Sequence, residues 1–311
     1  MTVLDVPSGR PPALATPRRG DARLAKLSLN QKTVNSLGLR DAVELCVRTG
    51  IPSIGVWREP LAELGARRAG ALIRSAGLRV SSLCRGGFLT HATPEGRAEA
   101  LADNRRAIEQ AAELGTRTLV LVVGGLPAGS RDLVGARAQV ADGIAALAPY
   151  AEQYGVQLAL EPMHPIYCAD RGVLSTLDDA LDLAEPFPPA VVGVVVDTFH
   201  VWWDPALADA IARAGERISS YQVCDWVLPL PADTLLARGV MGDGHIDFAA
   251  LTQAVTAAGY GGDVEVEIFN ADVWAAPPDE VAATVARRYV QLVQPSLNLP
   301  VPHSSSSSTP M

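Results

Sequence analysis

The sequence predicts a closed (β/α)8 TIM barrel, and three observations support this fold class. Eight short apolar or β-branched runs alternate with eight longer stretches of helical periodicity. Five of those stretches end in a glycine just before the next apolar run, as expected where a helix stops and the chain turns into a parallel sheet. Polar residues follow the runs, where barrels of this type carry their active sites. The alternative is an open doubly wound sheet, but no GxGxxG turn follows any run.

The expected strands are, in chain order, Leu24–Leu29, Ser53–Val56, Val80–Cys84, Thr118–Val123, Val156–Leu160, Val191–Val196, Ile218–Cys224 and Val264–Ile268. The expected helices are Leu39–Thr49, Leu61–Ala76, Pro94–Leu114, Ala136–Tyr154, Thr176–Ala184, Pro205–Ala214, Phe248–Ala258 and Pro277–Leu292. The punctuating glycines stand in RTGIPSIGV, SAGLRVSSL, ELGTRTLVL, QYGVQLALE and AAGYGGDVEVE. A glycine accepts the left-handed conformation that ends a helix.

Composition places the chain among soluble globular proteins. Of its 311 residues 48% are apolar and 19% charged, enough for a large core. We expect one barrel domain over residues 23–293, between disordered tails at 1–22 and 294–311, the latter rich in Ser and Pro. The net charge of −8 without a basic run argues against nucleic-acid or membrane partners. Four scattered cysteines and the lack of a signal peptide or a long apolar run favour a cytoplasmic location.

Three carboxylates mark the expected active site. Glu161, Asp197 and Glu267 end the strongly apolar runs LALE, VGVVVD and VEVEIF. A single such acid is as often a helix cap or a salt-bridge partner, but three that converge on one mouth repel one another unless a cation lies between them. Hard oxygen ligands suit Mn²⁺, with Mg²⁺ or Co²⁺ as alternatives. Glu265 projects from the same face as Glu267 and competes for its role.

The ordered segments EPMHP, DTFH, QVCD and EVEIF resemble the sugar phosphate isomerase/epimerase superfamily, the xylose isomerase-like TIM barrels, over roughly residues 23–293. Members include ketose 3-epimerases, inosose dehydratases and C-glycoside deglycosidase catalytic subunits. The resemblance implies one divalent cation on Glu161, Asp197 and Glu267, with Glu161 and Glu267 also as the acid/base pair. Gln222 stands where members carry a ligand His. An amide oxygen there favours Mn²⁺ over Zn²⁺; the alternative is that Gln222 hydrogen-bonds substrate and water completes the site.

Further candidates flank these acids. His164 is a possible catalytic base, or else a supporting hydrogen-bond partner. The resemblance implies that His200 contacts substrate and that Arg238, in the Gly-rich segment ARGVMGDGHID, helps close the pocket. Arg85 and Arg58 could grip a carboxylate or a ring oxygen, although arginines near strand ends often pair with a neighbouring acid. The expected substrate-binding residues are His200, Arg238, Arg85, Asn30 and Trp57, whose ring offers a face for a sugar.

The expected function is a divalent-metal-dependent sugar isomerase or epimerase that acts on a ketose or keto-polyol through an enediolate. The alternative is a lyase of the same fold: an inosose-type dehydratase, or a C-glycoside deglycosidase catalytic subunit that acts on 3-oxo-glycosides and needs a small β-sheet partner subunit. A homo-oligomer is the other possible assembly. A non-catalytic sugar-binding barrel is disfavoured by the complete set of carboxylates.

Overall fold

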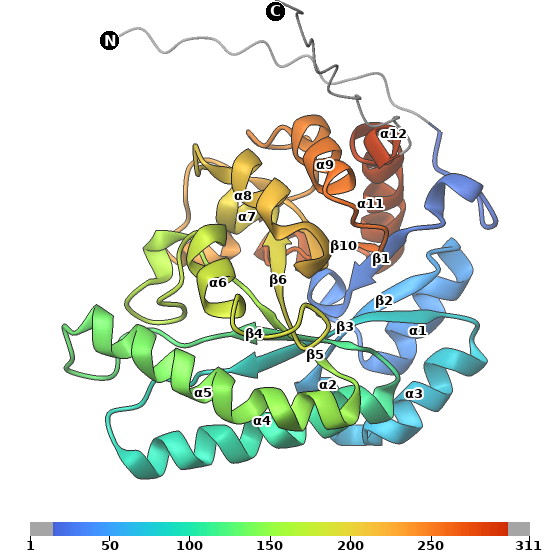
Figure 1. The fold of residues 1–311 in the computed structure, drawn as a ribbon. Coiled ribbons are helices and arrows are strands. Elements are labelled where there is room, and N and C mark those ends of the chain that lie inside the picture. The colour runs from blue at the N-terminus through green and yellow to red at the C-terminus, as the bar shows by residue number, and fades with distance from the viewer. Residues whose placement is uncertain (1–14, 298–311) are drawn as a thin grey trace, which may run out of the picture.

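The computed structural model describes residues 15–297, and the expected tail positions 1–14 and 298–311 lie outside them. Eight parallel strands close into a barrel in the order β1-β10-β7-β6-β5-β4-β3-β2, so the predicted fold class is confirmed (Figure 1). The barrel strands are β1 Leu27–Asn30, β2 Ser53–Trp57, β3 Arg79–Gly87, β4 Thr118–Val122, β5 Gln157–Leu160, β6 Val192–Asp197, β7 Ile218–Val223 and β10 Val264–Val266. A two-stranded antiparallel ribbon, β8 Asp225–Trp226 and β9 Arg238–Gly239, follows β7.

Helices surround the barrel on its outer side (Figure 1). The α-helices are α1 Leu39–Thr49, α2 Arg58–Leu64, α3 Ala66–Ser75, α4 Pro94–Leu114, α5 Leu133–Tyr154, α6 Leu177–Ala184, α7 Thr198–Val201, α8 Leu207–Ala214, α9 Phe248–Ala257, α10 Ala271–Ala275, α11 Pro278–Leu292 and α12 Gln294–Leu297. The 3-10 helices are η1 Ala22–Leu24, η2 Gln31–Val34, η3 Pro165–Tyr167, η4 Gly215–Arg217 and η5 Thr234–Ala237. No helix within residues 15–297 is long and apolar enough to cross a membrane.

The predicted elements are present, with two corrections. The first strand begins at Leu27 rather than Leu24, because the Asp21 side chain caps η1 by accepting a hydrogen bond from the Arg23 amide. The single helix expected over Leu61–Ala76 is wrong: Gly65, at φ +75° and ψ 147°, separates α2 from α3. The five punctuating glycines all have positive φ, namely Gly50, Gly77, Gly115, Gly155 and Gly259.

The core has two parts. The larger lies between the barrel and its helices and contains most of the buried aliphatic side chains. A smaller cluster contains one side chain from each of six barrel segments, namely Trp57, Cys84, Val120, Ala159, Val195 and Phe269. Val120 of this cluster also lines a cavity at the barrel mouth. This second cluster therefore fills the barrel interior at the level where the polar residues of the strand ends begin.

Candidate active site

The predicted acids meet at the mouth formed by the carboxyl ends of the strands. Asp197 ends β6 and lies in register with Gln222 of β7, which in turn lies in register with Glu265 of β10. Glu161 and Glu267 follow directly after β5 and β10. All five side chains are at most 4% exposed. Parallel register thus brings residues distant in the sequence into one buried polar layer.

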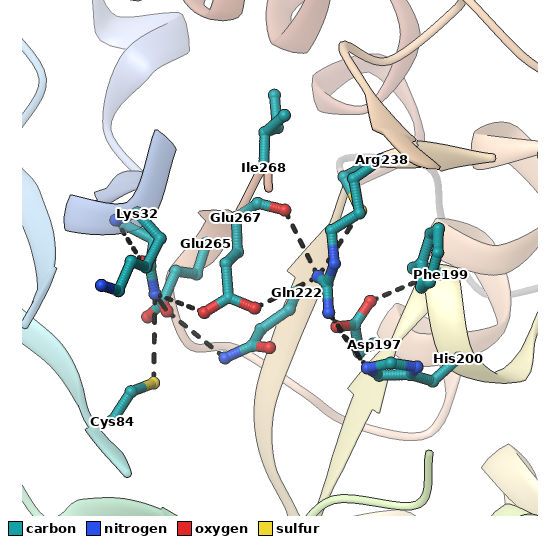
Figure 2. Close-up of polar contacts among 12 residues, drawn as sticks. Lys32, Cys84, Asp197, Phe199, His200, Gln222, Arg238, Glu265, Glu267 and Ile268 are labelled. Carbon is teal, nitrogen blue, oxygen red and sulfur yellow. Dashed lines mark hydrogen bonds and ion pairs between the residues drawn. The ribbon is translucent and has the colours of Figure 1, made fainter. Parts of the chain in front are cut away.

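Arg238 lies between two of the predicted metal ligands (Figure 2). Its Nη1 donates to Asp197 Oδ2 at 2.9 Å and to Glu267 Oε2 at 3.1 Å. Asp197 Oδ1 also accepts the Phe199 amide, which fixes the carboxylate at the start of α7. Arg238 itself is 2% exposed, so this is a buried ion-pair network rather than a surface contact. One guanidinium here faces more than one carboxylate.

The Glu161 carboxylate has no partner within the described part of the chain. It forms no hydrogen bond or ion pair there, although the residue is 4% exposed. Burial raises the pKa of Glu161 well above its ordinary value, and the charges of Asp197 and Glu267 raise it further. The buried amide oxygen Oε1 of Gln222 also lacks a hydrogen-bond partner. Unpaired buried oxygens are costly unless a cation or a donor satisfies them, so these residues fit a divalent cation.

Potential ligand atoms form two groups. Glu161, Asp197 and His200 each place one such atom within 4.8 Å of the others, and Cys84, Glu265 and Glu267 do the same. The Arg238 guanidinium links the groups through Asp197 and Glu267. The structure therefore divides the predicted carboxylate ligands, with Glu161 and Asp197 in one group and Glu267 in the other, and Arg238 links the two groups.

The hydrogen bonds of Glu265 favour Glu267 as the ligand from β10. Oε1 of Glu265 accepts from Asn30 and Gln222, and Oε2 accepts from Ser81 and Ser82. The carboxylate fits against β2 because a Cβ at Gly55 would lie 2.5 Å from Oε1. Each oxygen of Glu265 accepts from two side chains, whereas Glu267 accepts from Asn30 and Arg238 and lines the cavity, which Glu265 does not.

His200 lies in the same layer and lines the cavity. Its Nδ1 accepts the backbone N–H of His164 at 3.2 Å, while Nε2 lies 3.0 Å from Arg238 Nη2. A neutral imidazole accepts at one nitrogen, so both contacts cannot be hydrogen bonds at once. Burial lowers the pKa of His200 well below its ordinary value, with Arg238 adding to the effect. The tautomer that keeps the His164 bond carries its proton on Nε2, toward Asp197.

His164 is not on the wall of the cavity that Glu161 and Glu267 line, which favours the supporting role over that of a catalytic base. Its ring packs against Trp226 and Trp203, with centroids 4.8 and 5.7 Å apart. Its Nδ1 accepts the amide of Ile166 at the start of η3. Met163, its neighbour in the sequence, lines the cavity instead. Glu161 and Met163 therefore share the cavity wall, whereas the His164 ring packs against the tryptophans beside it.

Asn30 is a supporting residue rather than part of the cavity wall. Its Nδ2 donates to Glu267 at 2.9 Å and to Glu265 at 2.6 Å. Its Oδ1 accepts the indole N–H of Trp57 at 2.8 Å. Asn30 therefore orients Glu267, and Trp57 presents its ring to the cavity while its N–H is used within the chain.

The mouth contains a cavity of about 190 Å³. Glu161, Glu267, His200 and Arg238 lie on its wall beside apolar side chains, and Arg85 lies on its outer part. Further cationic residues of the wall, Arg171 and Lys32, were not assigned a role from the sequence. The cavity wall thus combines buried carboxylates with four cationic side chains, Lys32, Arg85, Arg171 and Arg238.

Asp225 positions Arg238, a role that the sequence did not reveal. Its carboxylate accepts backbone N–H groups of Gly242, Gly244 and Ile246 at 2.8, 2.8 and 3.0 Å. The pairing of Asp225 with Gly239 on the β8–β9 ribbon places Arg238 over the mouth. The sequence feature that could have indicated this role is the segment GVMGDGHID, which follows Asp225 closely and whose glycines leave backbone N–H groups accessible to a carboxylate.

A buried acidic mouth on a parallel eight-stranded barrel defines a class of enzymes built at the strand carboxyl ends. A family model described as xylose isomerase-like TIM barrel matches residues 33–291. The chain belongs to this family, as the sequence segments predicted.

Two solved structures share the fold. Protein SMc04130 from Sinorhizobium meliloti 1021 is 47% identical, with a TM-score of 0.84 over 87% of this chain and 99% of that one. The IOLI protein, solved with a zinc atom, is 22% identical, with a TM-score of 0.76 over 88% of this chain and 100% of that one. At this identity the second comparison shows the fold alone.

Two curated relatives are enzymes. A 3-dehydroshikimate dehydratase from Pseudomonas aeruginosa is 33% identical over 53% of this chain, and an L-ribulose 3-epimerase from Mesorhizobium japonicum is 30% identical over 42%. The matches cover 25% and 40% of the lengths of those two proteins. The family therefore contains both epimerases and dehydratases.

Proposed function

We propose that the protein is a divalent-metal-dependent isomerase or epimerase that removes a proton beside the ketone of a ketose or keto-polyol. The observation that carries this proposal is the environment of the Glu161 carboxylate. This carboxylate is buried, has no partner within residues 15–297, and lines the same small cavity as Glu267. A carboxylate that no residue of the described chain engages is available to accept a proton from carbon and to return it. Two carboxylates on one cavity provide an acid and a base.

Four residues would hold the cation: Glu161, Asp197, Gln222 and Glu267. Gln222 would contribute the amide oxygen that now lacks a partner. When bound, the ion supplies Lewis-acid polarisation of the substrate carbonyl. A protein of the same fold, the IOLI protein, was solved with a zinc atom, and the oxygen-rich donor set of this chain favours Mn²⁺.

The remaining residues bind and orient the substrate. In the tautomer described above, His200 donates from Nε2 to a substrate oxygen. Arg238 provides further N–H donors at the same end of the cavity. The ring of Trp57 offers an apolar face for the carbon chain of a sugar, while Asn30 keeps the Glu267 carboxylate oriented.

Dehydration is the second candidate, and the 33% identity to a 3-dehydroshikimate dehydratase favours it. Removal of the same proton leads to loss of water when a hydroxyl lies β to the ketone. Both reactions share the first step, so the site described above serves either. They differ in whether the proton is returned to carbon or a hydroxide leaves.

The test is a screen of ketoses and inososes with Mn²⁺-loaded protein in D2O, followed by NMR. We expect deuterium to enter the substrate beside the ketone; a new diastereomer identifies epimerisation, and an unsaturated ketone identifies dehydration. Glu161→Gln should abolish exchange. Glu59→Gln, which changes an exposed acid on the same wall, should not. Equal exchange by the wild type and Glu161→Gln would contradict the proposal.

A further inference from the structure

Arg85 differs from the other arginines near the active site. It lies where the central cavity meets an outer groove of about 580 Å³, and both are lined by Arg85 and Glu59. Five arginines line the two spaces: Arg58, Arg85, Arg106, Arg171 and Arg238. Each of the other four pairs with an acid, whereas the Arg85 guanidinium forms no hydrogen bond or ion pair with any residue from 15 to 297.

The position of Arg85 is nevertheless well defined. Its guanidinium lies 4.3 Å from the ring centre of Phe88 and 5.8 Å from that of Trp57. Stacking of this kind holds the flat group by its faces and leaves its N–H edge available for a ligand. Half-burial is unfavourable for a charge: burial lowers the pKa of Arg85, the nearby carboxylate of Glu59 opposes this effect, and Arg171 lowers the pKa further.

The sequence left open whether Arg58 or Arg85 would bind an anion, and the structure separates them. Arg58 donates two hydrogen bonds to Asp103, at 2.8 and 2.9 Å, and one to Gln110. It is therefore used within the chain. Arg85 retains all its N–H donors for a molecule that enters the cavity.

We infer that the substrate carries a carboxylate at the end remote from its ketone, and that Arg85 is the specificity-determining residue that binds it. The inference rests on the proposed function, because it takes the ketone to lie at the acids Glu161 and Glu267. The substrate class is then a keto-polyol acid rather than a neutral sugar. A bidentate guanidinium–carboxylate pair would satisfy the unpaired edge of Arg85.

Charge matching favours a carboxylate over a phosphate. Arg171 lies 3.6 Å from Asp170, although its Nε has no hydrogen-bond partner, and Lys32 donates to Asn35 and contacts the Trp57 ring at 4.9 Å. Among the five arginines, Arg85 is the one whose guanidinium has neither an ion pair nor a hydrogen bond within residues 15–297, and its single fork matches one carboxylate. A phosphate dianion is usually met by several cations or by a helix N-terminus. The positive charges of Lys32 and Arg171 on the same wall would attract the carboxylate without a hydrogen bond to it.

Three matched probes test the inference: D-fructose, D-fructuronate and D-fructose 6-phosphate, which differ at carbon 6 as hydroxymethyl, carboxylate and phosphate ester. Calorimetric titration of the Mn²⁺-loaded protein gives the affinity of each without need for turnover. We expect D-fructuronate to bind at least tenfold more tightly than D-fructose, and Arg85→Gln to remove this preference. The inference would be overturned by equal affinities in the wild type, by a preference that survives Arg85→Gln, or by tighter binding of the phosphate ester.

Arg106→Gln is the matched control, because Arg106 lines the same outer groove but pairs with Asp103 and is exposed. Its preference should equal that of the wild type, and loss of preference in this variant as well would point to overall charge and overturn the role of Arg85. Solvent-deuterium exchange on the same probes is scored separately. Absence of exchange with every ketone tested would count against the proposed function, whereas absence of a carboxylate preference in binding would count against this inference.

Discussion

Arg238 Nη1 lies 2.9 Å from Asp197 Oδ2, although the two residues are 41 positions apart and both are buried. The oxygen that a cation would need is thus engaged by the protein's own positive charge. In the metal-free protein this ion pair partly offsets the repulsion between Asp197 and Glu267. The proposed metal binding would therefore be coupled to the position of Arg238.

Arg238→Met should separate the stabilising effect of Arg238 on the metal-free fold from its competition with a bound metal ion. Removal of one member of a buried ion pair costs about 3–5 kcal/mol, so the free energy of unfolding of the metal-free variant should fall by about 3 kcal/mol in urea titrations. Its Mn²⁺ affinity should rise by at least about tenfold, or about 1.4 kcal/mol, because the competing cation is gone. Arg213→Met, which removes exposed pairs with Asp178 and Asp182, is the control. Unchanged stability and affinity would contradict the coupling.

The metal-free protein should lose stability as the pH rises from 5 to 8. Burial raises the pKa of Glu267 from 4.5 to about 8, against the opposing effect of Arg238. Between these values the folded state holds a proton that the unfolded chain has released, so Glu267 alone lowers the free energy of unfolding by up to about 1.4 kcal/mol per pH unit, and Glu161, whose pKa is also raised, adds to the fall. Urea titrations with a chelator at pH 5, 6.5 and 8 measure this. Glu267→Gln should flatten the slope; a slope equal to that of the wild type would refute the assignment.

Gln222→His should keep a metal site but shift its preference toward Zn²⁺ or Co²⁺ over Mn²⁺. The change replaces the unpartnered amide oxygen by an imidazole nitrogen, a ligand that borderline ions prefer. Competitive titrations at fixed pH compare the two proteins, since an imidazole must be deprotonated to bind. The same preference in both would mean that Gln222 does not contact the metal and hydrogen-bonds substrate instead.

His164 and His200 should differ in their effects on proton exchange. His200→Ala should retain its metal and lower the rate of solvent-deuterium exchange by about a hundredfold or more, the usual contribution of a positioned proton donor. His164→Ala should leave the rate within about threefold, since its ring packs against Trp226 and Trp203. Loss of metal from His200→Ala, or an equal loss of rate in His164→Ala, would reverse these roles.

Much of the fold was predictable because its signals are local. Apolar runs and C′ glycines predicted all eight barrel strands, and the acids at the ends of β5, β6 and β10 followed from strand order. The break at Gly65 was missed because the residues on both sides of it are good helix formers. Periodicity alone does not distinguish one helix from two that are joined by a glycine.

The details of the site depended on contacts that periodicity does not contain. The sequence already favoured Glu267 over Glu265 by its place nearer the strand end, but the hydrogen bonds that Ser81 and Ser82 of β3 donate to Glu265 could not be foreseen. The placement of Arg238 depends on a loop that is anchored through Asp225. The orientation of His164 depends on how the chain turns after β5. Each is a tertiary property of segments remote in the sequence.

The most direct test of the proposed metal site is the Mn²⁺ stoichiometry of the wild type and Asp197→Ala, measured by elemental analysis after loading and gel filtration. Asp197 is fully buried and has a ligand atom within 4.8 Å of those of Glu161 and His200. We predict one ion per chain in the wild type and none in Asp197→Ala, with circular dichroism to confirm that the variant is folded. A folded Asp197→Ala that retains one ion per chain, or a wild type that binds none, would contradict the account.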